Sequence, residues 1–230
     1  MSVPSFKSNQ WILSLVFLGL FLGLTISGVP VARAEVKPAL VIFPFIVEKI
    51  EDPARGAVCP ICKGFRRSSE VLPGVAPRIL TRELYEKMEA LGIFTVLTLE
   101  KVEEGLSHWG RKRFEESLVS SSIQFGKEFK ADFVLVGIIF RFEERIGSSL
   151  GIEKPASVAF DLHLFRMRDG KKVWDGGFDE TQRPLSENLF QIGSFFRRKA
   201  KWLTAEELAS VGMDEILKKL PEIQELEAKP

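Results

Sequence analysis

Apolar positions recur along this chain with two different spacings, and these spacings predict its elements. Continuous or alternating apolar residues indicate strands, whereas apolar residues three and four positions apart indicate helices. The segment DFVLVGIIFRFEER is the strongest strand pattern, and Pro44 marks the end or an edge bulge of the first strand. The pattern predicts strands over 39–47, 94–99, 132–145, 157–167 and 171–178, and helices over 81–91, 100–131 (with a break at 120–122) and 204–220.

Three local signals set the ends of these elements. Gly92 follows the helix over 81–91 as a C-cap. Asp169-Gly170 is typical of a two-residue hairpin turn between the last two strands. Thr204 and Glu207 have the spacing of a capping box at the start of the final helix.

The order of elements predicts the fold class. Strands joined through helices require at least one parallel pair with a right-handed crossover, and the terminal hairpin adds antiparallel strands. We therefore predict an α/β (α+β) fold: a single mixed β-sheet with helices packed on it, ending in a β-hairpin and a C-terminal helix. This domain spans 35–220, with a cysteine-containing loop over 48–78, an aromatic and basic connection over 179–203, and a tail over 221–230.

The amino terminus has the pattern of a secretory signal peptide. Lys7 precedes an uncharged apolar stretch over 11–26, and Ala32-Arg33-Ala34 gives the small-x-small cleavage pattern. An uncleaved anchor is the alternative, but the apolar stretch is short for a spanning helix, which needs about 20 residues. No cysteine lies near the cleavage site. We expect a periplasmic, soluble chain that is cleaved after Ala34 and is not lipidated.

The charge balance argues against nucleic-acid binding. Residues 1–34 contain two of the 32 Lys and Arg residues and none of the 31 Asp and Glu residues, so the cleaved chain has a net charge near −1. Nucleic-acid-binding domains usually carry a clear basic excess. The remaining length suits one domain.

The order of several short motifs resembles a known group of envelope domains. The motifs are Pro44-Phe45, Leu91-Gly92, Ala131-Asp132, Val136-Gly137 and Asp169-Gly170-Lys171. Over residues 39–178 they are similar to the amino-terminal domain of the Tol-system β-propeller protein, the curli-secretion lipoprotein and the penicillin-binding-protein activator lipoproteins. The resemblance implies a periplasmic interaction or assembly module that is not an enzyme. The chain is too short to carry a propeller and has no lipidation cysteine, and pore formation does not transfer to it.

Cys59-Pro60-Ile61-Cys62 is the sharpest local motif. A C-x-x-C pair can form a disulfide, exchange disulfides, or supply half of a zinc site. Lys63 follows where haem attachment needs a histidine. The remaining soft donors, His108 and His163, show no second paired spacing, so we expect no metal and no cofactor. In an oxidising compartment the Cys59–Cys62 disulfide is the favoured interpretation.

The histidines and acidic residues suggest no catalytic constellation. His108 lies in a polar helical stretch and is expected on the surface, and His163 is expected on the exposed or half-buried face of its strand. Asp175, Asp179 and Glu180 lack the regular acidic spacing of an EF-hand loop, so we expect them in turns and in solvent.

A cluster of cations and aromatics before the last helix is the best partner-binding segment in the sequence. The composition suits an acidic partner or an anionic membrane surface. The alternative is that its aromatics pack on the core while the cations stay in solvent. Its residues are Phe195, Phe196, Arg197, Arg198, Lys199, Lys201 and Trp202.

Two functions follow from these patterns. The first is a non-enzymatic exported module that binds an envelope protein or assembles with it. The alternative is a thiol-active protein that uses Cys59 and Cys62 for disulfide exchange or metal binding.

Overall fold

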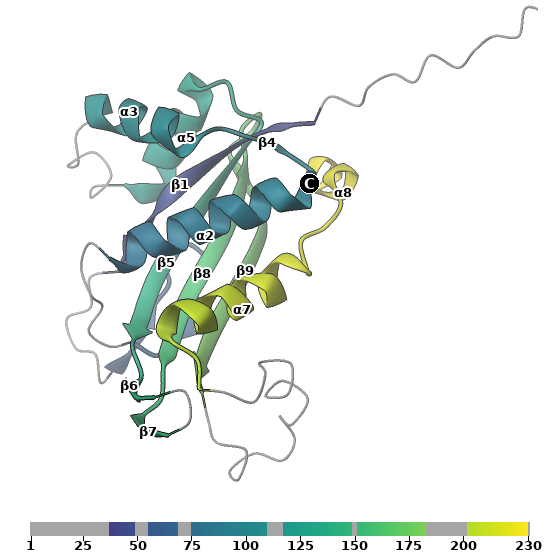
Figure 1. The fold of residues 1–230 in the computed structure, drawn as a ribbon. Coiled ribbons are helices and arrows are strands. Elements are labelled where there is room, and N and C mark those ends of the chain that lie inside the picture. The colour runs from purple at the N-terminus through teal and green to yellow at the C-terminus, as the bar shows by residue number, and fades with distance from the viewer. Residues whose placement is uncertain are drawn as a thin grey trace, which may run out of the picture. The chain divides into compact units, whose positions relative to one another are not determined.

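A five-stranded mixed sheet forms the centre of the domain (Figure 1). The computed structural model describes residues 37–48, 55–68, 75–109, 117–148, 151–182 and 202–229. The strand order is β4-β1-β5-β8-β9, in which β1 pairs in parallel with β4 and β5, and β8 pairs antiparallel with β5 and β9. This arrangement confirms the predicted mixed sheet. The strands span Ala39–Val47 (β1), Thr95–Val96 (β4), Phe133–Glu143 (β5), Ser157–Arg166 (β8) and Lys171–Thr181 (β9).

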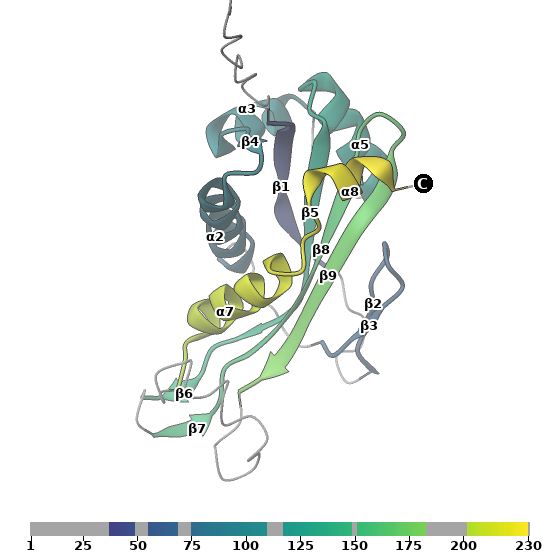
Figure 2. The same cartoon turned by 90° about the vertical axis from the view of Figure 1, so that its right-hand side faces the viewer.

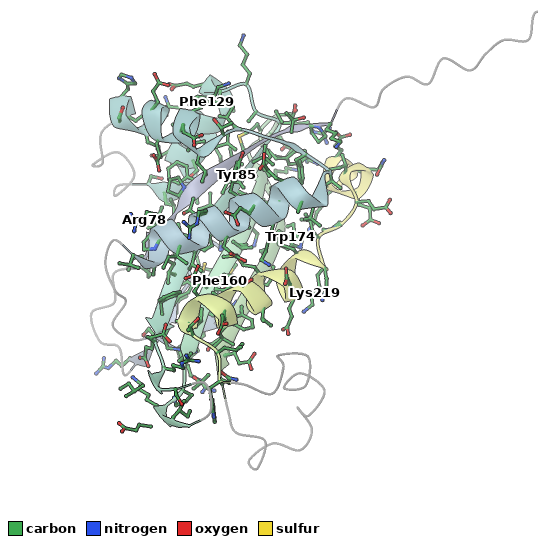
Figure 3. All side chains as sticks on the ribbon, viewed as in Figure 1. Arg78, Tyr85, Phe129, Phe160, Trp174 and Lys219 are labelled. Carbon is green, nitrogen blue, oxygen red and sulfur yellow. The ribbon has the colours of Figure 1, made fainter. Side chains whose placement is uncertain are left out.

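Two helices cover one face of the sheet. Helix α2 (Ala76–Leu91) and helix α7 (Ala205–Leu217) lie together on this face, as Figure 2 shows. The indole N–H of Trp174 donates to the backbone carbonyl of Lys219 just after α7, at 3.2 Å (Figure 3). The predicted capping box of α7 is confirmed, because the Thr204 hydroxyl and the Glu207 carboxylate each accept a backbone N–H of the other residue. The core of this layer includes Leu40, Ile42, Phe45, Leu80, Leu84, Met88, Phe160, Leu162, Leu208 and Met213.

The opposite face is covered by two different elements. Helices α3 (Leu99–Trp109) and α5 (Leu118–Glu128) pack on one end of it, around Phe43, Phe125 and Val134. The short strands β2 (Ala57–Val58) and β3 (Phe65–Arg66) form an antiparallel hairpin over Ile138, Phe140 and Ala159 of the same face. In Figure 2 this hairpin lies across the sheet from α2 and α7. The central strands β5 and β8 are therefore buried on both sides.

Several element boundaries differ from the sequence prediction. Helix α2 begins at Ala76 instead of Thr81, with a proline in its first turn, where a missing N–H costs nothing. The predicted break at 120–122 is wrong, because these serines lie inside α5 and the Ser122 hydroxyl donates to the Leu118 carbonyl. Strand β4 has two residues where six were predicted over 94–99.

Segments predicted as irregular also contain regular structure. The loop over 48–78 contains the β2–β3 hairpin, and the loop after β5 contains a small ribbon of β6 (Ile146–Gly147) and β7 (Ile152–Lys154). The tail over 221–230 contains helix α8 (Ile223–Ala228), which buries Leu226. The turn between β8 and β9 has four residues, with Gly170 at φ 69°, and not two. Among the described residues, no helix is both long and apolar enough to cross a bilayer.

Candidate functional site

The C-x-x-C motif forms the tight turn of the β2–β3 hairpin. The backbone N–H of Cys59 donates to the Gly64 carbonyl at 2.8 Å, and the N–H of Lys63 donates to the Cys59 carbonyl at 3.0 Å. Lys63 has a φ of 63°, in the left-handed region that closes such turns. The N–H of Gly64 also approaches the Cys62 sulfur at 3.4 Å. Both cysteines are thereby fixed in a short, closed turn beside the sheet.

Two polar residues of β8 lie beneath this turn. Asp161 and His163 are two positions apart, so their side chains leave the strand on the same face. Asp161 is 1% exposed and His163 is fully buried. The expectation that His163 lies on an exposed or half-buried face is therefore wrong, because the cysteine turn covers that face of the strand. His108 is exposed on α3, as predicted.

The turn and the strand bring four potential metal ligands together. One donor atom from each of Cys59, Cys62, Asp161 and His163 lies within 4.8 Å of the other three. The Cys59 sulfur is 3.2 Å from Nε2 of His163, and the Cys62 sulfur is 3.5 Å from Oδ2 of Asp161. Thiolate, imidazole and carboxylate groups are the donors that protein zinc sites use.

Arg66 of β3 orients the carboxylate of this cluster. Its Nε and Nη2 atoms both lie 2.7 Å from Oδ1 of Asp161, which leaves Oδ2 directed at Cys62. The guanidinium passes over Gly177 of β9, where an added Cβ would lie 2.0 Å from Nη2 of Arg66. With glycine at this position the guanidinium has room to reach Asp161.

Burial determines the protonation of the cluster when no metal is bound. Burial raises the pKa of the Cys59 thiol to about 12, while the backbone amides of Cys62 and Ile61 partly oppose this rise. Burial, together with the charge of Lys172, lowers the pKa of His163 to about 4. The imidazole is therefore neutral near pH 7. Its Nδ1 has no hydrogen-bond partner among the described residues, and its Nε2 faces only a sulfur.

Cys59 is not placed as a catalytic nucleophile or as an exchange-active thiol. A catalytic Cys–His pair needs access to substrate, whereas Cys59 and His163 are both fully buried. Reactive thiols have a lowered pKa, and that of Cys59 is raised. In the structure Cys59 and Cys62 are not bonded to each other. The disulfide between them stays a prediction.

The outer face of the same hairpin is apolar. Val58 and Phe65 lie opposite each other across the two strands and are 56% and 59% exposed. The backbone of Arg67 holds the hairpin to the sheet, because its N–H donates to Asp179 at 3.0 Å and its carbonyl accepts from Arg141 at 2.9 Å. The hairpin thus presents an exposed apolar pair on an anchored base.

The acidic segment on β9 is also placed differently from the prediction. Asp175, Asp179 and Glu180 lie within the strand and not in a turn. Asp179 forms an ion pair with the buried Arg141 at 2.6 Å, and Asp175 pairs with Lys172 at 2.5 Å. Asp175 and Asp179 therefore have structural partners on the face of the sheet that the hairpin covers.

The predicted partner-binding segment falls almost entirely outside the described residues. Of residues 195–202 the structure describes only Trp202, which is half-buried and whose carbonyl accepts a hydrogen bond from Arg145. The other six residues of the prediction, Phe195, Phe196, Arg197, Arg198, Lys199 and Lys201, lie outside the described residues.

Comparison with known proteins gives only distant likenesses. No protein-family model matches the chain, and no curated protein matches it. The chain is similar to the PelC dodecamer from Paraburkholderia phytofirmans (10% identity, TM-score 0.44, covering 85% of this chain and 90% of that one). It is similar to lipoprotein GNA1162 from Neisseria meningitidis (15% identity, TM-score 0.42, covering 71% and 98%).

A third solved structure shows a likeness of the same order. It is the LpoB C-terminal domain from Salmonella enterica, with 13% identity, a TM-score of 0.41, and coverage of 66% of this chain and 87% of that one. Likenesses this distant do not say what the chain binds or does. The family resemblance of the ordered sequence motifs stays an expectation.

Proposed function

We propose that this chain is an exported, non-enzymatic module of the cell envelope that binds another envelope protein through the outer face of the β2–β3 hairpin. The signal-peptide pattern over 1–34 and the ordered motifs over 39–178 support the compartment and the class of protein. The arrangement of the hairpin supports the site of contact.

The exposed Val58–Phe65 pair is the observation that carries this proposal. Large apolar side chains on an anchored, well-positioned element are typical of the centre of a protein–protein contact. The Phe65 ring lies over Gly56, where an added Cβ would be 2.5 Å from the ring, so the ring has a defined seat on the hairpin. A rigid aromatic side chain loses little conformational entropy when a partner covers it.

Site-specific crosslinking tests the contact. A photoreactive phenylalanine analogue at position 65 is expected to give a discrete adduct with one envelope protein in intact cells. Leu91, 44% exposed at the end of α2 on the other side of the sheet, gives the matched control position. Excess wild-type chain without the photoreactive residue should compete for the partner and reduce the amount of adduct. Excess chain carrying V58S and F65S should not reduce it.

The same experiment can refute the proposal. An adduct pattern at position 65 that equals the pattern at position 91, or that the V58S/F65S chain competes equally well, contradicts it. A chain with residues 195–202 scrambled tests the basic and aromatic segment separately. If scrambling abolishes the adduct while V58S and F65S do not, the contact lies in that segment and not on the hairpin. Fractionation of cells tests export, since the proposal requires the chain in the periplasm.

A further inference from the structure

We propose that Cys59, Cys62, Asp161 and His163 form a closed, structural binding site for a zinc ion. This inference goes beyond the proposed function and does not depend on it. It concerns the inner face of the hairpin, whereas the partner contact concerns the outer face.

The distances between the donor atoms suit a tetrahedral ion. With zinc–ligand distances of about 2.0–2.3 Å, the corners of the tetrahedron lie roughly 3.3–3.8 Å apart. The Cys59–His163 and Cys62–Asp161 distances of 3.2 and 3.5 Å are close to this range, and no separation in the cluster exceeds 4.8 Å. A contraction of about 1 Å at the widest separation would complete the coordination shell.

The charges around the site balance when an ion is present. Two thiolates, one carboxylate and a neutral imidazole carry three negative charges, of which a zinc ion neutralises two. Arg66, bonded to the far oxygen of Asp161, neutralises the third. The backbone amides that point to the cysteine sulfurs stabilise thiolates in the same way.

The ion would also give the buried imidazole of His163 a strong partner. A fully buried imidazole normally hydrogen-bonds through at least one nitrogen to a strong partner. His163 has only a sulfur at Nε2 and no partner at Nδ1 within the described part of the chain. A cation at Nε2 supplies that strong partner, and the proton of the neutral imidazole then lies on Nδ1. A disulfide between Cys59 and Cys62 would leave this imidazole as it is.

The donor set selects the kind of cation and its role. Thiolate and imidazole ligands favour zinc over calcium or magnesium, which take oxygen ligands. Four protein ligands leave no open position for a water or a substrate, which is the mark of a structural site. The ion would tie the hairpin at 59 and 62 to the sheet at 161 and 163.

Metal content and cobalt spectroscopy test this site. The exported chain, purified without chelator, is expected to contain about one zinc ion per chain. After zinc is removed and Co²⁺ is added, it should show a thiolate-to-cobalt charge-transfer band in the near ultraviolet and intense visible bands of tetrahedral cobalt. C62S and H163Q should bind Co²⁺ at least about tenfold more weakly and change these bands.

Matched variants separate ligands from bystanders. H108Q alters the exposed histidine of α3 and should leave cobalt binding unchanged. R66M should keep the thiolate bands but weaken Co²⁺ binding by about 10- to 100-fold, because Arg66 only orients a ligand. If C62S or H163Q fails to fold, the charge-transfer band of the refilled wild-type chain still reports whether sulfur binds the ion.

Two results would overturn the inference. The first is a reduced wild-type chain that takes up no Co²⁺, whether or not it was isolated with a Cys59–Cys62 disulfide. The second is a cobalt spectrum that both C62S and H163Q leave unchanged. Metal binding without a specific adduct at position 65 would support this site and refute the partner contact. A specific adduct without metal binding would support the partner contact and refute this site.

Discussion

Replacing Gly177 with alanine should loosen the hairpin by displacing the side chain that anchors it. Gly177 lies opposite Asp161 across the β8–β9 pairing. Its added Cβ would be 2.0 Å from Nη2 of Arg66 and 2.5 Å from Oδ1 of Asp161. The backbone of Gly177 is not in the left-handed region, so the methyl group acts by displacement alone. Both contacts are shorter than 3.0 Å, so the Arg66 guanidinium and the Asp161 carboxylate must both shift, and the longer, partly exposed Arg66 side chain can move further.

The magnitude follows from two opposing contributions. Alanine in a strand interior is favoured over glycine by about 0.5–1 kcal/mol. Against this, Asp161 is 1% exposed and loses a charge-assisted hydrogen bond worth about 1.5–3 kcal/mol. The full cost of breaking a buried ion pair, about 3–5 kcal/mol, does not apply because the Arg66 side chain is 22% exposed. We expect G177A to lower the free energy of unfolding by about 1–2 kcal/mol.

Urea unfolding measures this change, with the slope of the transition expected to stay constant. G151A is the matched control, because an added Cβ at Gly151 meets no atom within 4 Å. In an R66A background the methyl group at 177 should cost less, because its contacts with Arg66 are gone, and a double-mutant cycle detects this difference. A G177A chain as stable as the wild type, or more stable, would show that Arg66 does not lie over Gly177.

Three further predictions concern the last helix, the turn between β8 and β9, and the metal site. T204A removes the capping box that Thr204 forms with Glu207 and should lower stability by about 1 kcal/mol, measured by thermal unfolding. The hydrogen bond from Arg166 holds the pKa of Asp169 down at about 2, so its stabilisation is complete above the ordinary aspartate pKa near 4 and is lost as the pH falls towards 2. D169N should reduce the fall in the free energy of unfolding between about pH 4 and pH 2. The same fall in D169N and in the wild type would contradict this prediction. Chelation of the zinc ion should lower the melting temperature and expose residues 55–68 to protease, because the ion holds the hairpin on the sheet. Equal cleavage with and without chelator would show that the ion does not hold the hairpin in place.

The sequence pattern predicts the central strands because buried strands contain long runs of apolar and β-branched residues. Strands β5 and β8 lie in the middle of the sheet, so nearly all their positions are buried, and their bounds differ from the prediction by at most two residues. The start of α2 was missed because Pro77 and Arg78 interrupt the apolar spacing before Leu80. The short strands of the β2–β3 hairpin have two residues each, too few to show any periodicity.

The sequence indicates only the two cysteines of the candidate site. Cys59 and Cys62 are three positions apart and visible as a motif, whereas His163 is 104 positions from Cys59 and meets it only through the packing of the hairpin on β8. Asp161 and His163 alternate with apolar residues in β8, which is the pattern of a strand with one face in solvent, so the sequence gives no sign that the hairpin covers this face. A buried polar pair at such spacing needs partners, and the C-x-x-C turn supplies them.

X-ray absorption at the zinc edge of the purified, chelator-free chain tests the metal site most directly. The expected first shell has two sulfur atoms at about 2.3 Å and two nitrogen or oxygen atoms at about 2.0–2.2 Å. H163Q should change the nitrogen and oxygen part of that shell while the sulfur part remains. A shell of nitrogen and oxygen atoms alone, or one that H163Q does not alter, would contradict the site formed by Cys59, Cys62, Asp161 and His163.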